Sequence, residues 1–166
     1  SDEDVDKQQI YDYLEQMGVW HEVTEHAAVY NMVDLDNIEL PHREDDAKNL
    51  FVRDDKKRNY YLISVKGDKR IDLKGFCRAN GTRALSFASA DDLMVVMGLV
   101  PGAVTPLGLL NDFECRVTWF LDEDFTQGSG LIGVHPNDNT ATVWLRAQDL
   151  VGLIERHGNT ANIVRM

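Results

Sequence analysis

The chain has 166 residues, 43% of them hydrophobic, and a formal net charge of −11 at pH 7. This length fits one domain with a sizeable core, and no apolar run approaches the roughly 18–20 residues that cross a bilayer. Cys77 and Cys115 stand alone in unrelated segments, which argues against a disulfide framework or a zinc ribbon. The acidic first residues are unlike a signal peptide, so we expect a soluble, cytoplasmic protein with no membrane partner.

The first third of the chain alternates helical and extended patterns. Apolar residues at helical spacing predict a helix over 5–17 that ends at Gly18. An alternating pattern predicts a short strand over 20–26. A short helix is expected over 32–39, before Pro41 and an acidic loop.

The rest of the chain reads as a hairpin followed by mixed elements. A turn over 54–59 joins the first two strands, Asp72 caps one helix, and Ser89 caps the next. The predicted strands are 47–53, 60–65, 83–89, 116–121, 131–135, 140–145 and 162–165, and the predicted helices are 73–79, 90–98 and 147–156. Residues 99–112 read as a Gly/Pro loop. Without a regular βαβ alternation, the pattern predicts an α+β protein, one domain over 1–166, with a mixed sheet flanked by helices.

The charges are unevenly distributed along this acidic chain. Residues 48–83 contain eleven lysines and arginines but only four aspartates and no glutamate. A basic island on an acidic body is typical of a surface that meets a polyanion. A lysine-rich hairpin that is merely solvated explains the same pattern, and charge alone does not separate the two interpretations.

Two apparent motifs do not meet their own requirements. The stretch "GSGLIG" at 128–133 matches a dinucleotide-binding pattern, but a strand-like run and Pro136 follow it where a helix is required. The stretch "HEVTEH" at 21–26 resembles zinc motifs, but its two histidines are five residues apart and would not share a helix face. No nucleophile elbow is present. We therefore expect no cofactor, no metal and no covalent nucleophile.

Three features remain as candidates for chemistry. Lys48 opens an apolar strand, where it could hold a phosphate or simply protect a sheet edge. The loop "PGAVTPLG" at 101–108 could present backbone N–H groups to an oxyanion or be a rigid connection. His135 stands at the start of a polar insert in "LIGVHPNDNTATVWL", where it could be a base, a ligand or part of a turn.

Taken together, four segments resemble one known family. They are "AKNLFVRDDKKRNYYLI", "KRIDLK", "LSFASADDLMVVMGLVPGAVTPLGLLND" and "GVHPNDNTATV", in this order along the chain. They resemble the YbaK/ProRS-editing-domain family, and within it the freestanding Ala-tRNA(Pro) deacylases. The resemblance implies a curved mixed sheet flanked by helices and trans-editing, the hydrolysis of the ester between a wrong amino acid and tRNA.

The resemblance also implies roles for individual residues. Lys48 takes the place of a lysine that anchors the terminal adenosine, and the backbone at Gly102 lies against the ester. His135 borders the aminoacyl pocket and shapes it or moves a proton. In "HAAVYN", Asn31 replaces the family's hydroxyl residue, which alters a pocket wall. The catalytic candidates are Lys48, Gly102 and His135; the substrate-binding candidates are Tyr30, Asn31, Asn49, Thr105, Pro106 and Gly133; the tRNA-binding candidates are Lys56, Lys57, Arg58, Lys69 and Arg70.

The implied function is deacylation of Ala-tRNA(Pro), with prolyl-tRNA synthetase as a further partner. A synthetase pocket built for proline discriminates weakly against smaller alanine, because each missing methylene contributes only about 1–3 kcal/mol. Cys-tRNA(Pro) or another mischarged tRNA is an alternative substrate. A non-catalytic RNA-binding or regulatory module is the alternative from another class. The sequence does not indicate an oligomeric state.

Overall fold

The computed structural model describes residues 4–30 and 32–166, although the side chains of Met32 and Leu35 are outside the description. The helices are α1 (Lys7–Gln16), α2 (Met32–Asp36), α3 (Leu73–Asn80), α4 (Ala90–Met97) and α5 (Ala147–His157). The strands are β1 (His21–Glu25), β2 (Ala47–Asp54), β3 (Tyr60–Lys66), β4 (Leu85–Phe87), β5 (Val117–Asp122), β6 (Leu131–Val134), β7 (Ala141–Arg146) and β8 (Ala161–Val164). Three short 3₁₀ helices occupy Arg43–Asp45 (η1), Pro106–Asn111 (η2) and Glu123–Thr126 (η3).

Local capping explains where several helices begin and end. The Asp6 carboxylate accepts a hydrogen bond from the Gln9 backbone N–H, and the Gln9 side-chain oxygen accepts one from the Asp6 backbone N–H, so α1 starts later than the predicted residue 5. Ser89 caps α4 as predicted, by accepting from the Asp92 N–H. Asp72 occupies the cap position of α3, but its side chain makes no capping hydrogen bond, so that part of the prediction is wrong.

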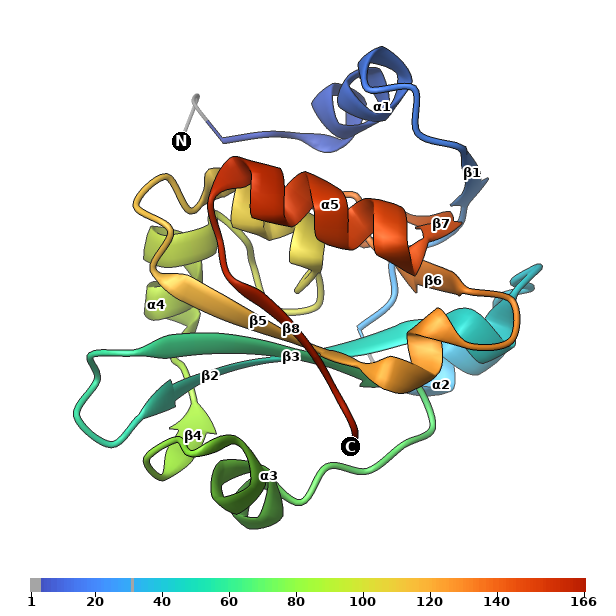
Figure 1. Cartoon of the computed structure of the whole chain (residues 1–166). Helices are drawn as coiled ribbons and strands as arrows, with labels where there is room; N and C mark the ends of the chain where they lie inside the picture. Colours follow the sequence, from blue (N-terminus) through green and yellow to red (C-terminus); the bar gives the residue numbers. More distant parts are fainter. Residues whose placement is uncertain (1–3, 31) are drawn as a thin grey trace.

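The strands form two sheets, both visible in Figure 1. The larger sheet has the order β4-β2-β3-β5-β8 and mixes antiparallel pairs with the parallel pairs β3-β5 and β5-β8. The smaller is antiparallel with the order β1-β7-β6. One isolated bridge, between Asp46 and Gly133, joins the start of β2 to β6. The mixed sheet and the α+β class are confirmed, and the structure adds this seam between two sheets.

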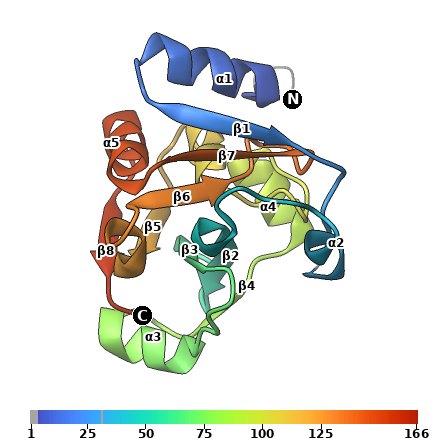
Figure 2. The same cartoon turned by 90° about the vertical axis from the view of Figure 1, so that its right-hand side faces the viewer.

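The core lies on both faces of the larger sheet, because side chains alternate along each strand. Leu62, Trp119 and Leu121 face a cluster that includes α1 and α5, while Ile63 and Phe120 face a second cluster that includes α3. Figure 1 shows α5 and α3 on opposite sides of this sheet, and Figure 2 shows α1 lying along the smaller sheet. Among the described residues, no helix is long and apolar enough to cross a bilayer.

Candidate active site

The candidate site lies at the seam between the two sheets. Two adjoining cavities open there, of about 210 Å³ and about 350 Å³, and both are lined by Asp46, Ala47, Gly102 and His135. Four segments meet at this point: β2, the end of β6, the loop before η2 and the segment after β1. The smaller cavity adds Asn49, Val104, Gly133 and Val134, and the larger adds His26, Val29, Tyr30, Lys48, Gly67 and Thr142.

Lys48 is held at the larger cavity by the loop that follows β3. Its ammonium donates a hydrogen bond to the backbone carbonyl of Lys69. β3 pairs with β2 along the whole of this region, whereas β4 pairs with β2 only from Val52 onward. The side of the strand at Lys48 that faces away from β3 is therefore open to the cavity, where a cation can meet an anionic ligand.

The Lys69 side chain points to the protein interior, which a count of charges along the sequence could not reveal. Its ammonium lies 2.6 Å from an Asp122 oxygen and 2.7 Å from an Asp124 oxygen. Burial lowers the pKa of Lys69, but the hydrogen bonds to the two aspartates outweigh this and raise it. This ammonium is thus occupied within the protein, so we remove Lys69 from the predicted tRNA contacts and give it the role of positioning Lys48.

Asn49 ties the loop before η2 to the larger sheet. Its amide nitrogen donates to the Val104 carbonyl at 3.3 Å, and its amide oxygen accepts from the Ser64 hydroxyl. The buried Trp119 ring donates in turn to the Ser64 oxygen at 3.0 Å. Asn49 therefore lines the smaller cavity, and it also completes a series of hydrogen bonds from Trp119 through Ser64 that fixes the loop.

Thr105 and Pro106 support the loop from behind. The Thr105 hydroxyl donates to the His135 carbonyl at 2.6 Å and accepts from the Leu107 N–H, which caps η2. Pro106 fits the first position of that helix, where no backbone donor is needed. Both side chains are buried and neither lines the cavities, so the predicted substrate contact becomes a supporting position.

The backbone conformation and surroundings of Gly102 both disfavour a larger residue. Its φ is +93°, and a Cβ built there would lie 3.2 Å from Cδ1 of the Tyr30 ring. Tyr30 is 71% exposed, and its segment is fixed because Val29 and Asn139 exchange hydrogen bonds of 3.3 Å and 3.1 Å. The backbone at Gly102 therefore lies directly beneath an aromatic ring at the mouth of the larger cavity.

Gly133 and Asn31 were also predicted to bind the substrate. A Cβ on Gly133 would overlap the Trp144 ring, so the glycine lets that ring pack behind the cavity wall. Asn31 lies outside the described residues. The structure places three other residues of "HAAVYN" at the larger cavity, namely His26, Val29 and Tyr30.

His135 has one ring nitrogen fixed and the other carrying a lone pair. Nδ1 lies 2.8 Å from the Ala141 carbonyl, and since a carbonyl only accepts, the neutral ring donates from Nδ1. Burial is the main cause that lowers the pKa of His135. The hydrogen bond to the Ala141 carbonyl raises the pKa, and His26, whose ring centre is 6.1 Å away, lowers it further. The imidazole is therefore neutral near pH 7, with Nε2 available to accept a hydrogen bond.

Asp46 is a site residue that the sequence analysis missed. It lines both cavities. Burial raises the pKa of its carboxyl to about 7, against the opposing effects of the Ala47 N–H and of Arg43. One signal in the sequence pointed to it, because residues two apart on a strand share a face and Asp46 stands two before Lys48.

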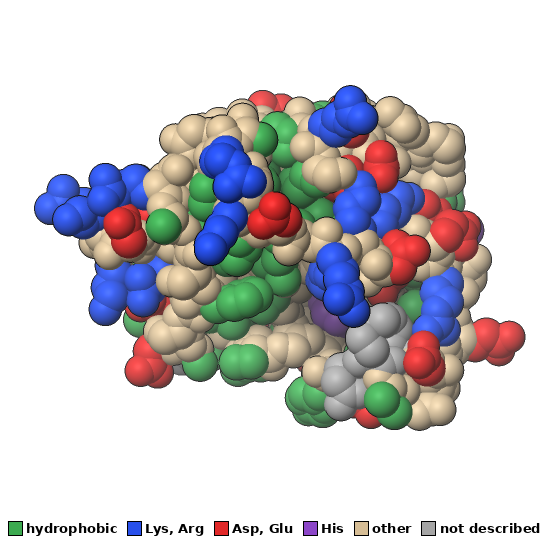
Figure 3. Space-filling model, turned by 90° about the horizontal axis from the view of Figure 1, so that it is seen from below, with side chains coloured by type: hydrophobic (Ala, Val, Ile, Leu, Met, Phe, Trp, Pro, Cys, Tyr) green, Lys and Arg blue, Asp and Glu red, His purple; other side chains and the backbone are tan. Residues whose placement is uncertain are grey.

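The basic island is only partly available to an external anion. Figure 3 shows lysine and arginine side chains gathered at the end of the molecule where the β2–β3 turn projects. Lys56, Lys57 and Arg58 are exposed in that turn, and no ion pair in the described part of the chain involves them. Four other cations of the island form ion pairs with aspartates, namely Arg53, Lys66, Lys69 and Arg83.

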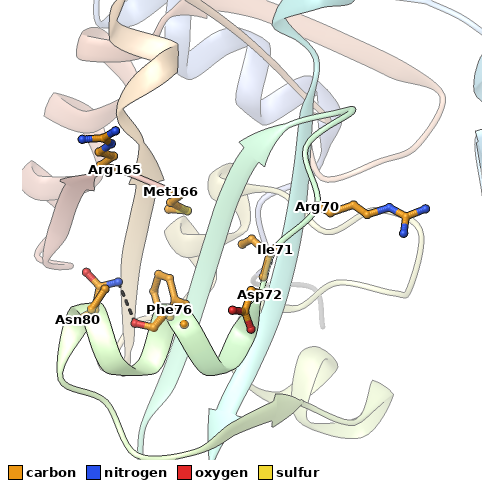
Figure 4. Close-up of a pocket in the computed structure, with 9 residues that line it drawn as sticks. Arg70, Ile71, Asp72, Phe76, Asn80, Arg165 and Met166 are labelled. Atoms are coloured by element: carbon orange, nitrogen blue, oxygen red, sulfur yellow. Dashed lines mark hydrogen bonds between the residues drawn. The ribbon is translucent and has the colours of Figure 1, made fainter.

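A third cavity, of about 290 Å³, lies between α3 and the end of the chain and shares no lining residue with the other two. Figure 4 shows Phe76 and Met166 at its wall, with Asn80 donating to the Phe76 carbonyl. The Arg70 side chain is directed away from them. Arg70 is exposed and stays a predicted tRNA contact. The only other charged side chains among the described residues that line this cavity are those of Asp72 and Arg165.

Comparisons with known proteins converge on one family. The family model described as "Aminoacyl-tRNA editing domain" matches residues 26–153. The prolyl-tRNA editing protein ProX of Acetoanaerobium sticklandii is 37% identical over 96% of this chain and 97% of its own. Prolyl-tRNA synthetase associated domain-containing protein 1 of Danio rerio is 29% identical over 95% and 86%. A crystal structure described as a candidate trans-editing enzyme for prolyl tRNA synthetase has the same fold, with a TM-score of 0.67 at 21% identity, covering 96% of both chains.

Proposed function

The chain belongs to the aminoacyl-tRNA editing domain family, and from this premise we propose that it hydrolyses mischarged tRNA, with Ala-tRNA(Pro) as its main substrate. The observation that carries the proposal is the meeting of Lys48, the Gly102 backbone and neutral His135 around adjoining cavities. The whole of 1–166 is proposed as one editing domain, because α1 lies outside the matched residues yet contributes to the same core as α5.

The reaction is ester hydrolysis and needs no nucleophile from the protein. Water adds to the ester carbonyl carbon, the bond to the ribose oxygen breaks, and that oxygen leaves with a proton, giving free alanine and tRNA. The neighbouring ribose hydroxyl can help to activate the water. Orientation of water and ester can supply about 7–11 kcal/mol of the barrier, so a site that only positions them is sufficient.

Each site residue has a part in that positioning. Lys48 binds the anionic 3′ end of the tRNA, as a point charge that its bond to the Lys69 carbonyl keeps at the cavity. The backbone at Gly102 faces the ester, where an N–H can stabilise the developing oxyanion. His135 offers Nε2 as an acceptor toward the cavity, which orients the water or the ribose hydroxyl.

The selectivity follows from size and is tested by a deacylation panel. A pocket lined by Val29, Tyr30 and the Gly102 loop admits a methyl side chain more readily than a proline ring. We expect rapid hydrolysis of Ala-tRNA(Pro) with Pro-tRNA(Pro) spared, measured by release of labelled amino acid. Cys- and Ser-tRNA(Pro) complete the panel. Faster release of cysteine would transfer the assignment to Cys-tRNA(Pro), and hydrolysis of none of the four esters would contradict the proposal.

The exposed cations of the β2–β3 turn are proposed to meet the tRNA backbone. From Lys48 to the end of β2 at Asp54 the strand rises about 20 Å, so the turn reaches the acceptor stem and not the ester. We propose that the protein acts in the cytoplasm, where tRNA is charged. Association with prolyl-tRNA synthetase is proposed as well, since the name of the Danio rerio relative states such an association for that protein.

Reversing the charges of this turn, as Lys56→Glu, Lys57→Glu and Arg58→Glu together, should weaken tRNA binding by at least about 10-fold. The slope of log affinity against log salt should fall by about 2 units, because fewer phosphate counterions are released. Filter binding of tRNA(Pro) from 50 to 300 mM salt measures both. The matched control, Lys56→Arg, Lys57→Arg and Arg58→Lys, keeps the charge and should keep the slope. An unchanged slope in the reversed variant would remove the turn from the interface.

A further inference from the structure

The carboxyl group of Asp46 is unexpected in a site that receives the anionic end of an RNA. It lines both cavities beside Gly102 and His135, and it stands two residues before Lys48 on the same strand face. A negative charge at this position repels phosphate. Its presence therefore calls for a part of the substrate that carries the opposite charge.

The position of Asp46 is fixed by its backbone. Its carbonyl accepts from the Gly67 N–H at 2.9 Å, and its own N–H donates to the Arg43 carbonyl at 3.2 Å. It also forms the single bridge to Gly133 that joins the two sheets. The backbone of Asp46 is thus held from three directions at a point where the residue lines both cavities.

The cations and imidazoles around Asp46 have other partners. The Arg43 guanidinium bonds Asp36 at 2.6 Å, and the Lys48 ammonium donates to the Lys69 carbonyl. The rings of His26 and His135 are held through Nδ1 by the backbone carbonyls of Ala27 and Ala141. Within the described ranges, no ion pair involves the Asp46 carboxylate.

The preceding residue, Asp45, is an aspartate whose carboxylate has partners within the protein. Asp45 is buried, and its two oxygens accept from the Lys66 ammonium and the Ser129 hydroxyl, each at 2.9 Å. Of the two neighbours, only Asp46 faces the cavities. Asp46 is half-buried, and a carboxylate that is partly removed from water without a cation is costly unless a ligand supplies the partner.

We propose that the Asp46 carboxylate binds the α-ammonium group of the aminoacyl ester and so selects substrates with a free amino group. The inference rests on the proposed function and names a further contact within the same site. The α-ammonium is the one cationic group of an alanyl ester. Bound to Asp46, it is placed between Lys48, which holds the nucleotide, and the Gly102 loop, which faces the carbonyl.

The ionisation of Asp46 agrees with this role. Burial is the main cause that raises the pKa of the carboxyl to about 7, and an ammonium partner would lower it again. Arg43 from η1 acts on this carboxyl as a nearby charge, and Lys48 from β2 and the histidines His26 and His135, which follow β1 and β6, line the larger cavity with it. An α-amino group titrates near 7.7–8.0 in peptides, so both partners are charged in the same range around neutral pH.

The test compares two esters that differ only at the amino group. Alanyl-tRNA(Pro) is converted by nitrous acid to lactyl-tRNA(Pro), in which a hydroxyl replaces the ammonium. For the wild-type protein, kcat/KM for the alanyl ester should exceed that for the lactyl ester by about 10- to 100-fold, after each is divided by its spontaneous hydrolysis rate. Asp46→Asn should lose this preference by slowing the alanyl reaction while changing the lactyl reaction by less than about 3-fold.

The outcomes separate the two proposals. Asp149→Asn changes a half-buried aspartate of α5 that lines none of the cavities described above; it is the matched control and should keep the wild-type preference. Equal loss on both esters in Asp46→Asn, or no preference in the wild-type protein, overturns the ammonium contact. Hydrolysis of neither ester by the wild-type protein overturns the proposed function and this inference with it.

The stability of the substrate-free protein gives a second measurement. In the folded state Asp46 holds its proton up to about pH 7, whereas an unfolded aspartate releases it near 3.9. Between these values the folded state binds more protons, so the contribution of Asp46 to stability falls as pH rises. Asp46→Asn should therefore raise the urea midpoint at pH 8 and leave it unchanged near pH 4. A lower midpoint at pH 8 would show that the carboxylate has a stabilising partner and would overturn the proposal.

Discussion

Replacing Lys48 with alanine should lower kcat/KM for alanyl-tRNA(Pro) by at least about 100-fold while the protein stays folded. The ammonium is the cation that the structure directs to the larger cavity, and it is fixed there by the Lys69 carbonyl. Its loss leaves the 3′ end of the tRNA unanchored, so the ester spends less time against the Gly102 loop. Single-turnover deacylation measures the rate, and circular dichroism checks the fold.

Two comparisons make the Lys48 result specific. Lys74→Ala removes an exposed lysine of α3 that lines none of the cavities described above, and it should leave kcat/KM unchanged. Lys48→Arg keeps the charge but changes its shape, so it should recover only part of the activity. A folded Lys48→Ala variant with wild-type activity would remove Lys48 from the site. If no variant or wild-type sample hydrolyses the ester but all bind tRNA, the non-catalytic alternative is correct.

Replacing Gly102 with alanine should lower the same rate by about 100-fold, because a displacement of about 1 Å at a reacting centre can cost that much. The residue has a φ of +93°, which an alanine rarely adopts, and the new Cβ would press on the Tyr30 ring. The loop must shift or the ring must move, and either change alters the wall against which the ester lies. Deacylation of alanyl-tRNA(Pro) at saturating enzyme measures the effect.

Gly152→Ala is the matched control for the Gly102 substitution. Gly152 lies within α5 and a Cβ there meets nothing within 4 Å, so the change should stabilise the helix by about 0.5–1 kcal/mol and leave the rate unchanged. Tyr30→Ala in the Gly102→Ala background separates the two causes of damage. Recovery of activity would assign the loss to the contact with the ring, and no recovery would assign it to the backbone angle. Full activity of Gly102→Ala alone would contradict the role given to the loop.

The elements that the sequence predicted well have local causes. The strand-like runs of β2 and β3 and the polar turn between them identify the hairpin, and Ser89 identifies the start of α4. Residues 99–112 were predicted as a loop, but they contain η2. The pair Thr105-Pro106 is a cap followed by a proline at the first helical position, a signal that was present but hidden among glycines and prolines.

The parts of the site that the sequence could not provide depend on distant contacts. The three residues Lys48, Gly102 and His135 were identified through the family resemblance, and the structure places them together. Lys69 was predicted as a tRNA contact from its place in the basic island, because its partners Asp122 and Asp124 are more than fifty residues away in the sequence. Asp46 was overlooked because burial raises its pKa, and burial depends on tertiary contacts that the sequence does not show.

The seam at Asp46 and Gly133 also separates two tasks within one pocket. The larger sheet carries Lys48 and Asn49, to which we assign the nucleotide end in the proposed function, while segments that flank the smaller sheet carry Tyr30 and His135, to which we assign the amino acid. Substitutions in the smaller sheet can therefore change which amino acid is removed while the grip on the tRNA terminus stays intact. In this architecture the larger sheet can stay constant while the segments around the smaller sheet vary. New editing specificities can therefore arise through substitutions in those segments alone.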